Sequence, residues 1–183
     1  LAYFEPEKIW LVEADPELAE ELKAKYDENP RCEVTHAAIT DRSGDVAFQV
    51  NEHRPSSSLL PIGEGTGEVF GKSMREEYSV TVPGRSLDDF FEDNSIESVD
   101  LMKVDIQGAE RLLIKGGRKA LQKVRLLYIE VLFVECYRGC ALFSELDPLL
   151  RSTGFKLRAM DDFRRGSDGG LAYGNGLYFR PDR

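Results

Sequence analysis

Three charged residues in the segment 99–110 stand close enough to share one reaction centre: Lys103, Asp105 and Glu110. An apolar strand pattern ends at Asp105, and Gly108 separates it from a helix pattern that begins at Glu110. Ligands of open α/β sheets bind outside the carboxyl ends of the strands, where this spacing places Asp105. Paired carboxylates transfer protons when their surroundings separate their pKa values. We therefore expect Asp105 and Glu110 to face one crevice, with Lys103 either orienting the reactants or simply pairing with Asp105.

Two further acids end or interrupt strand patterns. Glu13 ends an apolar strand, and in nucleotide-binding α/β folds an acid at the end of the second strand accepts hydrogen bonds from ribose hydroxyls. A solvated acid at a strand end would produce the same pattern. Glu130 interrupts the apolar run 125–133, which is costly unless it is paired, for example with Lys103, or lies at the strand end. His36 is expected to pack within its strand rather than act as a base.

The elements that position these residues alternate between strands and helices along the chain. Asp15 and Pro16 form a helix start, Ser86 caps a short helix, and Gly154 follows an amphipathic helix at 142–152. The least regular segment, 51–77, is a long loop that we expect to be functional or mobile, and its part 54–60 is a candidate cap for the crevice. Strand patterns occupy 8–13, 33–39, 45–50, 78–82, 99–106, 125–133, 155–160 and 170–179. This order predicts a doubly wound α/β sheet with an antiparallel C-terminal hairpin.

Length and composition exclude several classes of protein. The 183 residues suit a single domain, and the net charge of −9 argues against a nucleic-acid partner, whose phosphates need a cationic surface. No apolar run is long enough to span a membrane, and no signal peptide is visible. Cys32, Cys136 and Cys140 are too few for a disulfide framework, and no His or Cys cluster completes a metal site. We expect a cytoplasmic protein with reduced thiols, a small-molecule substrate and no bound metal.

Several stretches of the chain share their order and spacing with one enzyme family. They are V-E-A-D-P at 12–16, H-A-A-I-T-D-R-S-G at 36–44, S-L-D-D at 86–89, D-L-M-K-V-D-I-Q-G-A-E at 100–110 with L-I-K-G at 113–116, and Y-G-N-G-L-Y-F at 173–179. Together they resemble the FkbM family of S-adenosylmethionine-dependent methyltransferases. The similarity covers nearly the whole chain, and its most specific part is the segment around Asp105.

The resemblance implies a class I methyltransferase-like, Rossmann-like fold with S-adenosylmethionine as the cofactor. By this resemblance, Glu13 with its neighbour Ala14 binds the ribose hydroxyls, Ala37 and Ala38 lie beside adenine, and Asp105 sits near the transferred methyl group. The implied reaction is O-methylation of a small-molecule or glycan hydroxyl. It needs an aligned nucleophile and a base, for which the catalytic candidates are Lys103, Asp105 and Glu110, with Glu130 behind them.

The chain departs from the family pattern in two places. No G-x-G motif precedes Glu13, so the family's first strand and glycine-rich loop have no counterpart, and we expect residues 1–183 to form one domain without the first βα unit. Gln107 stands where the family often has glutamate. One alternative is therefore a truncated or degenerate, non-catalytic member that binds a ligand or partner. Another is a Rossmann-type NAD-dependent oxidoreductase, although the missing G-x-G-x-x-G motif and the closing hairpin speak against it.

Overall fold

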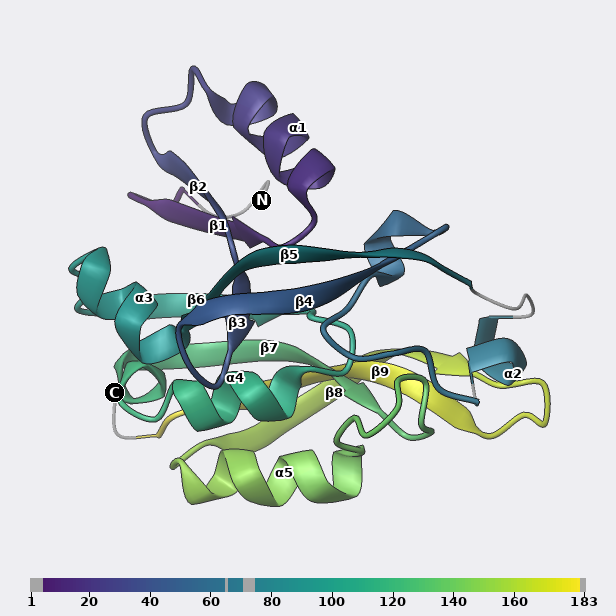
Figure 1. The fold of residues 1–183 in the computed structure, drawn as a ribbon. Helices are drawn as coiled ribbons and strands as arrows, with labels where there is room; N and C mark the ends of the chain where they lie inside the picture. Colours follow the sequence, from purple (N-terminus) through teal and green to yellow (C-terminus); the bar gives the residue numbers. More distant parts are fainter. Residues whose placement is uncertain (1–4, 65, 71–74, 182–183) are drawn as a thin grey trace.

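Parallel strands joined by a helix build the first part of the fold (Figure 1). The computed structural model describes residues 5–64, 66–70 and 75–181. Strand β1 (Ile9–Glu13) leads through helix α1 (Pro16–Tyr26) to β2 (Cys32–His36), which pairs with β1 in parallel. Directly after β2, the chain enters β3 (Ala38–Thr40). The predicted strand at 33–39 is thus two short strands, and they pair with different neighbours.

A second sheet begins with β3 and has the order β3-β5-β4. Strand β5 (Glu76–Ser86) is parallel to β3 on one edge and antiparallel to β4 (Gly44–Asn51) on the other. The segment between β4 and β5 is less irregular than predicted, since it contains a 3-10 helix, η1 (Arg54–Ser56), and helix α2 (Thr66–Phe70). Residues 65 and 71–74 of this segment lie outside the described part of the chain.

The third sheet has the order β6-β7-β9-β8 and carries most of the core. Strands β6 (Val99–Val104) and β7 (Val124–Leu132) are parallel, while β8 (Lys156–Arg165) and β9 (Leu171–Phe179) form an antiparallel hairpin, as predicted. The connecting helices are α3 (Leu87–Asp93), α4 (Glu110–Gly116), the 3-10 helix η2 (Ala120–Lys123) and α5 (Phe143–Ser152). The predicted α/β fold with a closing hairpin is confirmed, although its strands form three sheets.

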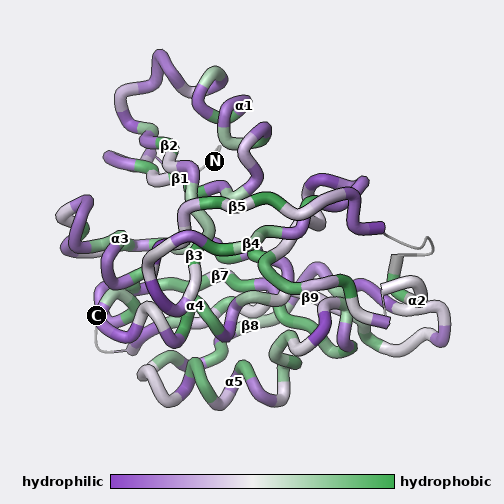
Figure 2. Tube along the Cα trace, viewed as in Figure 1, coloured by the Kyte–Doolittle hydropathy of each residue, from purple (hydrophilic) through white to green (hydrophobic). Residues whose placement is uncertain are grey.

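Only one face of the third sheet is fully buried. Leu127, Ile129 and Val131 of β7 have no exposed surface, because they point toward the side where α5 packs. The alternate residues, such as Tyr128 and Glu130, are only half-buried. The near-continuous apolar sequence of β7 is typical of a central strand, and β7 pairs with β6 on one side and β9 on the other. Figure 2 shows β7 as a largely hydrophobic strand, whereas α1 is mostly hydrophilic.

Local sequence signals fix the starts of two helices as predicted. Asp15 is the N-cap of α1, where its Oδ1 accepts the backbone N–H groups of Glu17 at 2.9 Å and Leu18 at 3.2 Å. Ser86 caps α3 by accepting the Asp89 N–H at 3.0 Å. These bonds satisfy amide groups that a helix leaves without internal partners. The cap at Asp15 matters for the site because it begins α1 directly after Glu13.

The state of the cysteines and the length of the helices bear on two of the sequence-based expectations. The three cysteines have free thiols, with Cys136 and Cys140 buried and Cys32 partly so. Within the described ranges, no helix combines the length and apolar character that crossing a membrane requires.

Gly116 lets the end of α4 lie directly against β3, and we predict that Gly116→Ala destabilises the fold. A Cβ at this position would lie 2.3 Å from the carbonyl oxygen of Thr40, which is backbone and cannot rotate away. The expected loss in the free energy of unfolding is about 1–3 kcal/mol, measured by urea denaturation. Gly67→Ala in α2 is the matched control, because a Cβ there meets nothing within 4 Å. Equal stability of the two variants would contradict the tight contact.

Candidate functional site

A cavity of about 100 Å³ lies just beyond the carboxyl ends of β1, β2 and β6. The residues that the sequence singled out for a cofactor share this cavity: its walls include Glu13, Ala14, Ala37, Ala38 and Asp105. They come from three separate segments of the chain, so only folding brings them together. This agreement is the strongest link between the sequence motifs and one place in the molecule.

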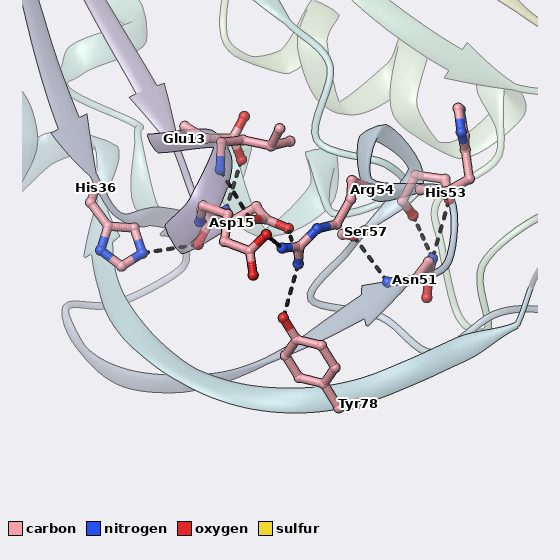
Figure 3. Close-up of polar contacts among 12 residues, drawn as sticks. Glu13, Asp15, His36, Asn51, His53, Arg54, Ser57 and Tyr78 are labelled. Atoms are coloured by element: carbon pink, nitrogen blue, oxygen red, sulfur yellow. Dashed lines mark hydrogen bonds and ion pairs between the residues drawn. The ribbon is translucent and has the colours of Figure 1, made fainter. Parts of the chain in front are cut away.

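The acid at the end of β1 is held by the backbone of the turn into α1. Glu13 Oε1 accepts the Asp15 N–H at 2.8 Å, and Glu13 is the register partner of His36 on β2. Burial raises the pKa of Glu13, although the backbone N–H groups of Asp15 and Ala14 oppose the shift. His36 Nε2 lies 3.1 Å from the Ala14 carbonyl oxygen and so braces the same turn (Figure 3). His36 thus contacts the turn, and the expectation that it does not act as a base stays a prediction.

Arg54 closes one side of the cavity and ties η1 to the start of α1 (Figure 3). One guanidinium nitrogen lies 3.1 Å from Oδ2 of the buried Asp15 and donates to the Tyr78 hydroxyl at 2.9 Å, and the other pairs with Glu17. Pro55, Ser57 and Leu59 of the same loop also line the cavity. The segment 54–60 thus lies at the cavity, and its role as a cap stays a prediction.

Asp105 is held from both sides at the cavity wall. Lys103 Nζ lies 2.9 Å from Asp105 Oδ2, and Gln107 Nε2 donates to Oδ1 at 2.6 Å. Lys103 is well exposed and forms the ion pair that the sequence left open as one alternative, whereas the alternative pairing with Glu130 is not formed. Because each carboxylate oxygen has its own donor, the carboxylate is oriented while its edge remains accessible from the cavity.

Gln107 is the residue that links this carboxylate to the protein interior. It adopts a left-handed backbone conformation, with φ of 53°, and its carbonyl oxygen accepts the Ser58 hydroxyl at 2.7 Å. The Tyr137 hydroxyl lies 2.5 Å from Gln107 Oε1 and 3.0 Å from the Ser56 carbonyl oxygen. Burial raises the pKa of Tyr137 well above its usual range, so this hydroxyl remains a donor. Sequence reasoning missed Tyr137, which follows no motif.

Glu110 does not share the cavity with Asp105, contrary to the expected common crevice. Its side chain is 1% exposed, and its Oε1 accepts the backbone N–H groups of Ile106 at 3.4 Å and Gly108 at 3.3 Å. Burial raises the pKa of Glu110 to about 7, against the effect of these backbone bonds. The carboxyl thus supports the turn that follows Asp105 from behind.

Glu130 is the third carboxyl near Asp105. It is half-buried on β7 and, within the described part of the chain, its side chain makes no hydrogen bond or ion pair. Burial raises the pKa of Glu130 to about 8, with further contributions from the charges of Asp105 and Glu110, while Lys103 acts in the opposite direction. In the residues that the structure describes, no three His, Cys, Asp or Glu side chains form a group suited to a metal ion.

The fold and the cavity define a Rossmann-like α/β protein whose ligand site lies at the carboxyl edge of parallel strands. Residues 3–157 match the family model described as the methyltransferase FkbM domain. The chain belongs to this family. Membership favours a methyltransferase over the NAD-dependent oxidoreductase that the sequence had left as an alternative.

Known proteins similar to this chain carry methyltransferase names. The chain is 30% identical over 175 residues to the 2-O-methyltransferase NoeI of Sinorhizobium fredii, covering 92% of this chain and 70% of that protein. It is 27% identical over 125 residues to the hexuronic acid methyltransferase AglP of Haloferax volcanii, covering 67% of this chain and 46% of that protein. The crystal structure of methyltransferase FkbM from Methylobacillus flagellatus superposes with a TM-score of 0.54 at 17% identity, covering 94% of this chain and 36% of that chain, and this likeness supports the fold.

Because the pKa of Glu110 is raised, we predict that its burial makes stability depend on pH. The folded protein keeps the Glu110 proton up to about pH 7, whereas an ordinary glutamate loses it near 4.5, so stability falls as the pH rises between these values. The decrease is on the order of 3 kcal/mol, since one pKa unit corresponds to about 1.4 kcal/mol.

Glu110→Gln removes this titration while keeping an oxygen for the two backbone N–H groups. Urea denaturation at about pH 5 and about pH 8 should show a smaller loss of stability for Glu110→Gln than for the unmodified protein. The pKa of Glu130 is also raised, so Glu130 contributes a loss of stability with rising pH in both the unmodified protein and Glu110→Gln. Glu21→Gln on the exposed side of α1 is the control. An identical pH dependence in all three proteins would show that Glu110 ionises normally.

Proposed function

We propose that this protein transfers a methyl group from S-adenosylmethionine to a hydroxyl oxygen of a glycan or another small molecule. The observation that carries the proposal is the shared cavity, which joins the acid after β1, the alanines between β2 and β3, and the acid after β6. Membership of the methyltransferase FkbM family supports the chemistry.

The cavity walls fit a nucleoside that carries ribose hydroxyls. Glu13 uses Oε1 for the Asp15 N–H, which leaves Oε2 to accept a ribose hydroxyl. Ala37 and Ala38 are buried and small, so they leave an apolar wall beside which a flat base can lie. Ligand pockets commonly enclose about 300–1,000 Å³, so the present cavity suits one part of the cofactor. S-Adenosylmethionine, when bound, supplies a methyl group attached to a cationic sulfur. An oxygen nucleophile takes this methyl group, and the sulfur leaves.

We propose Asp105 as the group that accepts the proton of the acceptor hydroxyl. It lies at the cavity wall, and its two oxygens are held by Lys103 and Gln107, so it is oriented before the acceptor arrives. Displacement needs the hydroxyl oxygen, the methyl carbon and the leaving sulfur in line, and a fixed carboxylate helps to align the first of these. Lys103 orients the carboxylate through its contact with Oδ2, and Glu110 acts from behind the turn as a positioning residue.

The relatives support a sugar hydroxyl as the acceptor. One is named a 2-O-methyltransferase and the other a hexuronic acid methyltransferase. The chain spans less than half of the second relative, so its substrate and partners are proposals for this protein. The net charge of −9 supports the exclusion of nucleic acid as the acceptor. A cytoplasmic location remains a prediction.

We also propose that residues 1–183 form one methyltransferase-like domain. The largest of the apolar clusters in the described residues supports this, because it contains Leu127 of β7 and Tyr178 of β9, and Trp10 and Val12 of β1 pack against it. Elements from both ends of the chain thus share one interior, which is the usual mark of a domain.

If Asp105 is the base, Asp105→Asn should lower kcat by about 10²–10⁴-fold while S-adenosylhomocysteine still binds. The value of kcat is measured by the transfer of labelled methyl to a panel of methyl glycosides. Binding of S-adenosylhomocysteine is measured by calorimetry. Asp100→Asn at the exposed start of the same strand is the matched control. Full activity of Asp105→Asn would remove Asp105 from the reaction. Binding without transfer by the unmodified protein would favour the non-catalytic alternative.

Gln107 gives a second prediction, on pH dependence. In Gln107→Glu a second carboxylate would lie against Asp105, and two like charges at hydrogen-bond distance retain a proton to higher pH. The acid limb of the kcat profile should therefore move up by about one pH unit. Gln107→Ala should lower kcat without moving the acid limb, because it removes one hydrogen bond to the Asp105 carboxylate and adds no charge. Unmoved profiles for both variants would show that Gln107 has no part in orienting Asp105.

A further inference from the structure

One buried hydroxyl joins two walls of the cavity. Tyr137 follows β7 and is 1% exposed. Its hydroxyl oxygen lies 2.5 Å from Gln107 Oε1, in the turn after β6, and 3.0 Å from the Ser56 carbonyl oxygen, in η1. Both neighbours are acceptors, and the hydroxyl carries a single hydrogen, so it fully satisfies one of them at a time.

The Ser56 carbonyl oxygen has a second donor. Asn51 at the end of β4 is fully buried, and its Nδ2 donates to that oxygen at 2.7 Å. The next residue is held as well, because Ser57 Oγ accepts the Asn51 backbone N–H at 3.1 Å (Figure 3). In the part of the chain that the structure describes, Gln107 Oε1 has no donor other than the Tyr137 hydroxyl. The hydroxyl hydrogen therefore points to Gln107, which is also the shorter contact.

This direction of the hydrogen bond fixes which end of the Gln107 amide meets Asp105. A glutamine amide has an oxygen that accepts and a nitrogen that donates, and the two exchange places when the amide rotates by half a turn. With its oxygen on Tyr137, the amide presents Nε2 to Asp105 Oδ1 at 2.6 Å. The rotated amide would place its oxygen against the carboxylate, and two acceptors at that distance repel each other. Burial raises the pKa of Tyr137, so the hydroxyl keeps the hydrogen on which this orientation depends.

We propose that Tyr137 is a positioning residue for Asp105 and acts through the Gln107 amide. The inference rests on the proposed function, because Asp105 is the proposed acceptor of the proton. Without the Tyr137 hydroxyl, the amide has no fixed orientation. In the rotated orientation Asp105 loses the donor on Oδ1 and keeps Lys103 on Oδ2. The carboxylate then holds one direction for only part of the time, which slows a step that needs alignment.

The cofactor side of the cavity should withstand the loss of the same hydroxyl. In the segment 54–60, the Ser56 carbonyl oxygen keeps Asn51 as its donor. Ser58 Oγ still donates to the Gln107 carbonyl oxygen at 2.7 Å. Loss of the hydroxyl therefore acts on the chemical step and leaves the cofactor wall in place, whereas loss of a merely structural group would affect both.

Tyr137→Phe tests the role because it removes the hydroxyl and keeps the ring. It should lower kcat for methyl transfer about tenfold, as expected for one lost hydrogen bond, and should change the Kd of S-adenosylhomocysteine by less than about twofold. Tyr178→Phe is the matched control and should leave kcat unchanged. Tyr178 is also fully buried, its hydroxyl donates to Asp147 Oδ1 at 3.0 Å, and neither residue lines the cavity.

A double-mutant cycle shows whether Tyr137 acts through Gln107. In a Gln107→Ala background, Tyr137→Phe should lower kcat no further, because the amide that the hydroxyl orients is gone. Three results would overturn the inference. They are full additivity of the two losses, an equal loss of kcat in Tyr137→Phe and Tyr178→Phe, and a weakening of S-adenosylhomocysteine binding that matches the loss of kcat.

A measurement without turnover separates this inference from the proposed function. In proton–nitrogen correlation NMR spectra, the Gln107 side-chain amide is identified by its absence in Gln107→Ala. One of its protons should resonate downfield of a free glutamine amide, because it bonds a carboxylate. Tyr137→Phe should move that proton toward the free value, and Tyr178→Phe should not; an unmoved signal in Tyr137→Phe would contradict the positioning role. Absence of methyl transfer by the unmodified protein would overturn the proposed function, and the amide signal would still decide the role of Tyr137.

Discussion

The site depends on one tight turn after β6. Gln107 and Gly108 adopt consecutive left-handed conformations, with φ of 53° and 90°, and a Cβ on Gly108 would lie 3.0 Å from the side chains of Tyr137 and Cys140. This turn reverses the chain within a few residues, so that Asp105 faces the cavity while Glu110 lies behind it. The same turn brings the Gln107 side chain between Asp105 and Tyr137. A side chain at Gly108 would disturb all of these placements together.

Three carboxyl groups near this turn differ because their surroundings differ. Asp105 has a lysine and an amide as donors at the cavity edge. Glu110 is fully buried and has only backbone N–H groups, so burial keeps its proton to about pH 7. Glu130 has neither kind of partner within the described chain and holds its proton to about pH 8. Buried carboxyls with raised pKa values beside an oriented carboxylate are common in sites of acid–base chemistry, which agrees with a transferase site.

Family membership and site geometry answer different questions. The match of residues 3–157 to the methyltransferase FkbM domain establishes descent and a class of chemistry. It does not distinguish Asp105, at the cavity wall, from Glu110, which the sequence places only five residues further along. The cavity and the hydrogen bonds make that distinction, since one carboxylate faces open space and the other faces the backbone of its own turn.

The sequence by itself determined the features that depend on near neighbours. Asp15 and Ser86 mark helix starts because a cap acts within three residues, and alternation marks β9 because a strand has a period of two. Acids that end strands were visible for the same reason, which is why Glu13 and Asp105 were found. Only the tertiary structure decided that these two share a cavity, that Tyr137 holds Gln107, and that one face of β7 stays half-exposed. Those facts arise from contacts between residues far apart in the chain, and no local pattern records which distant element covers a given face.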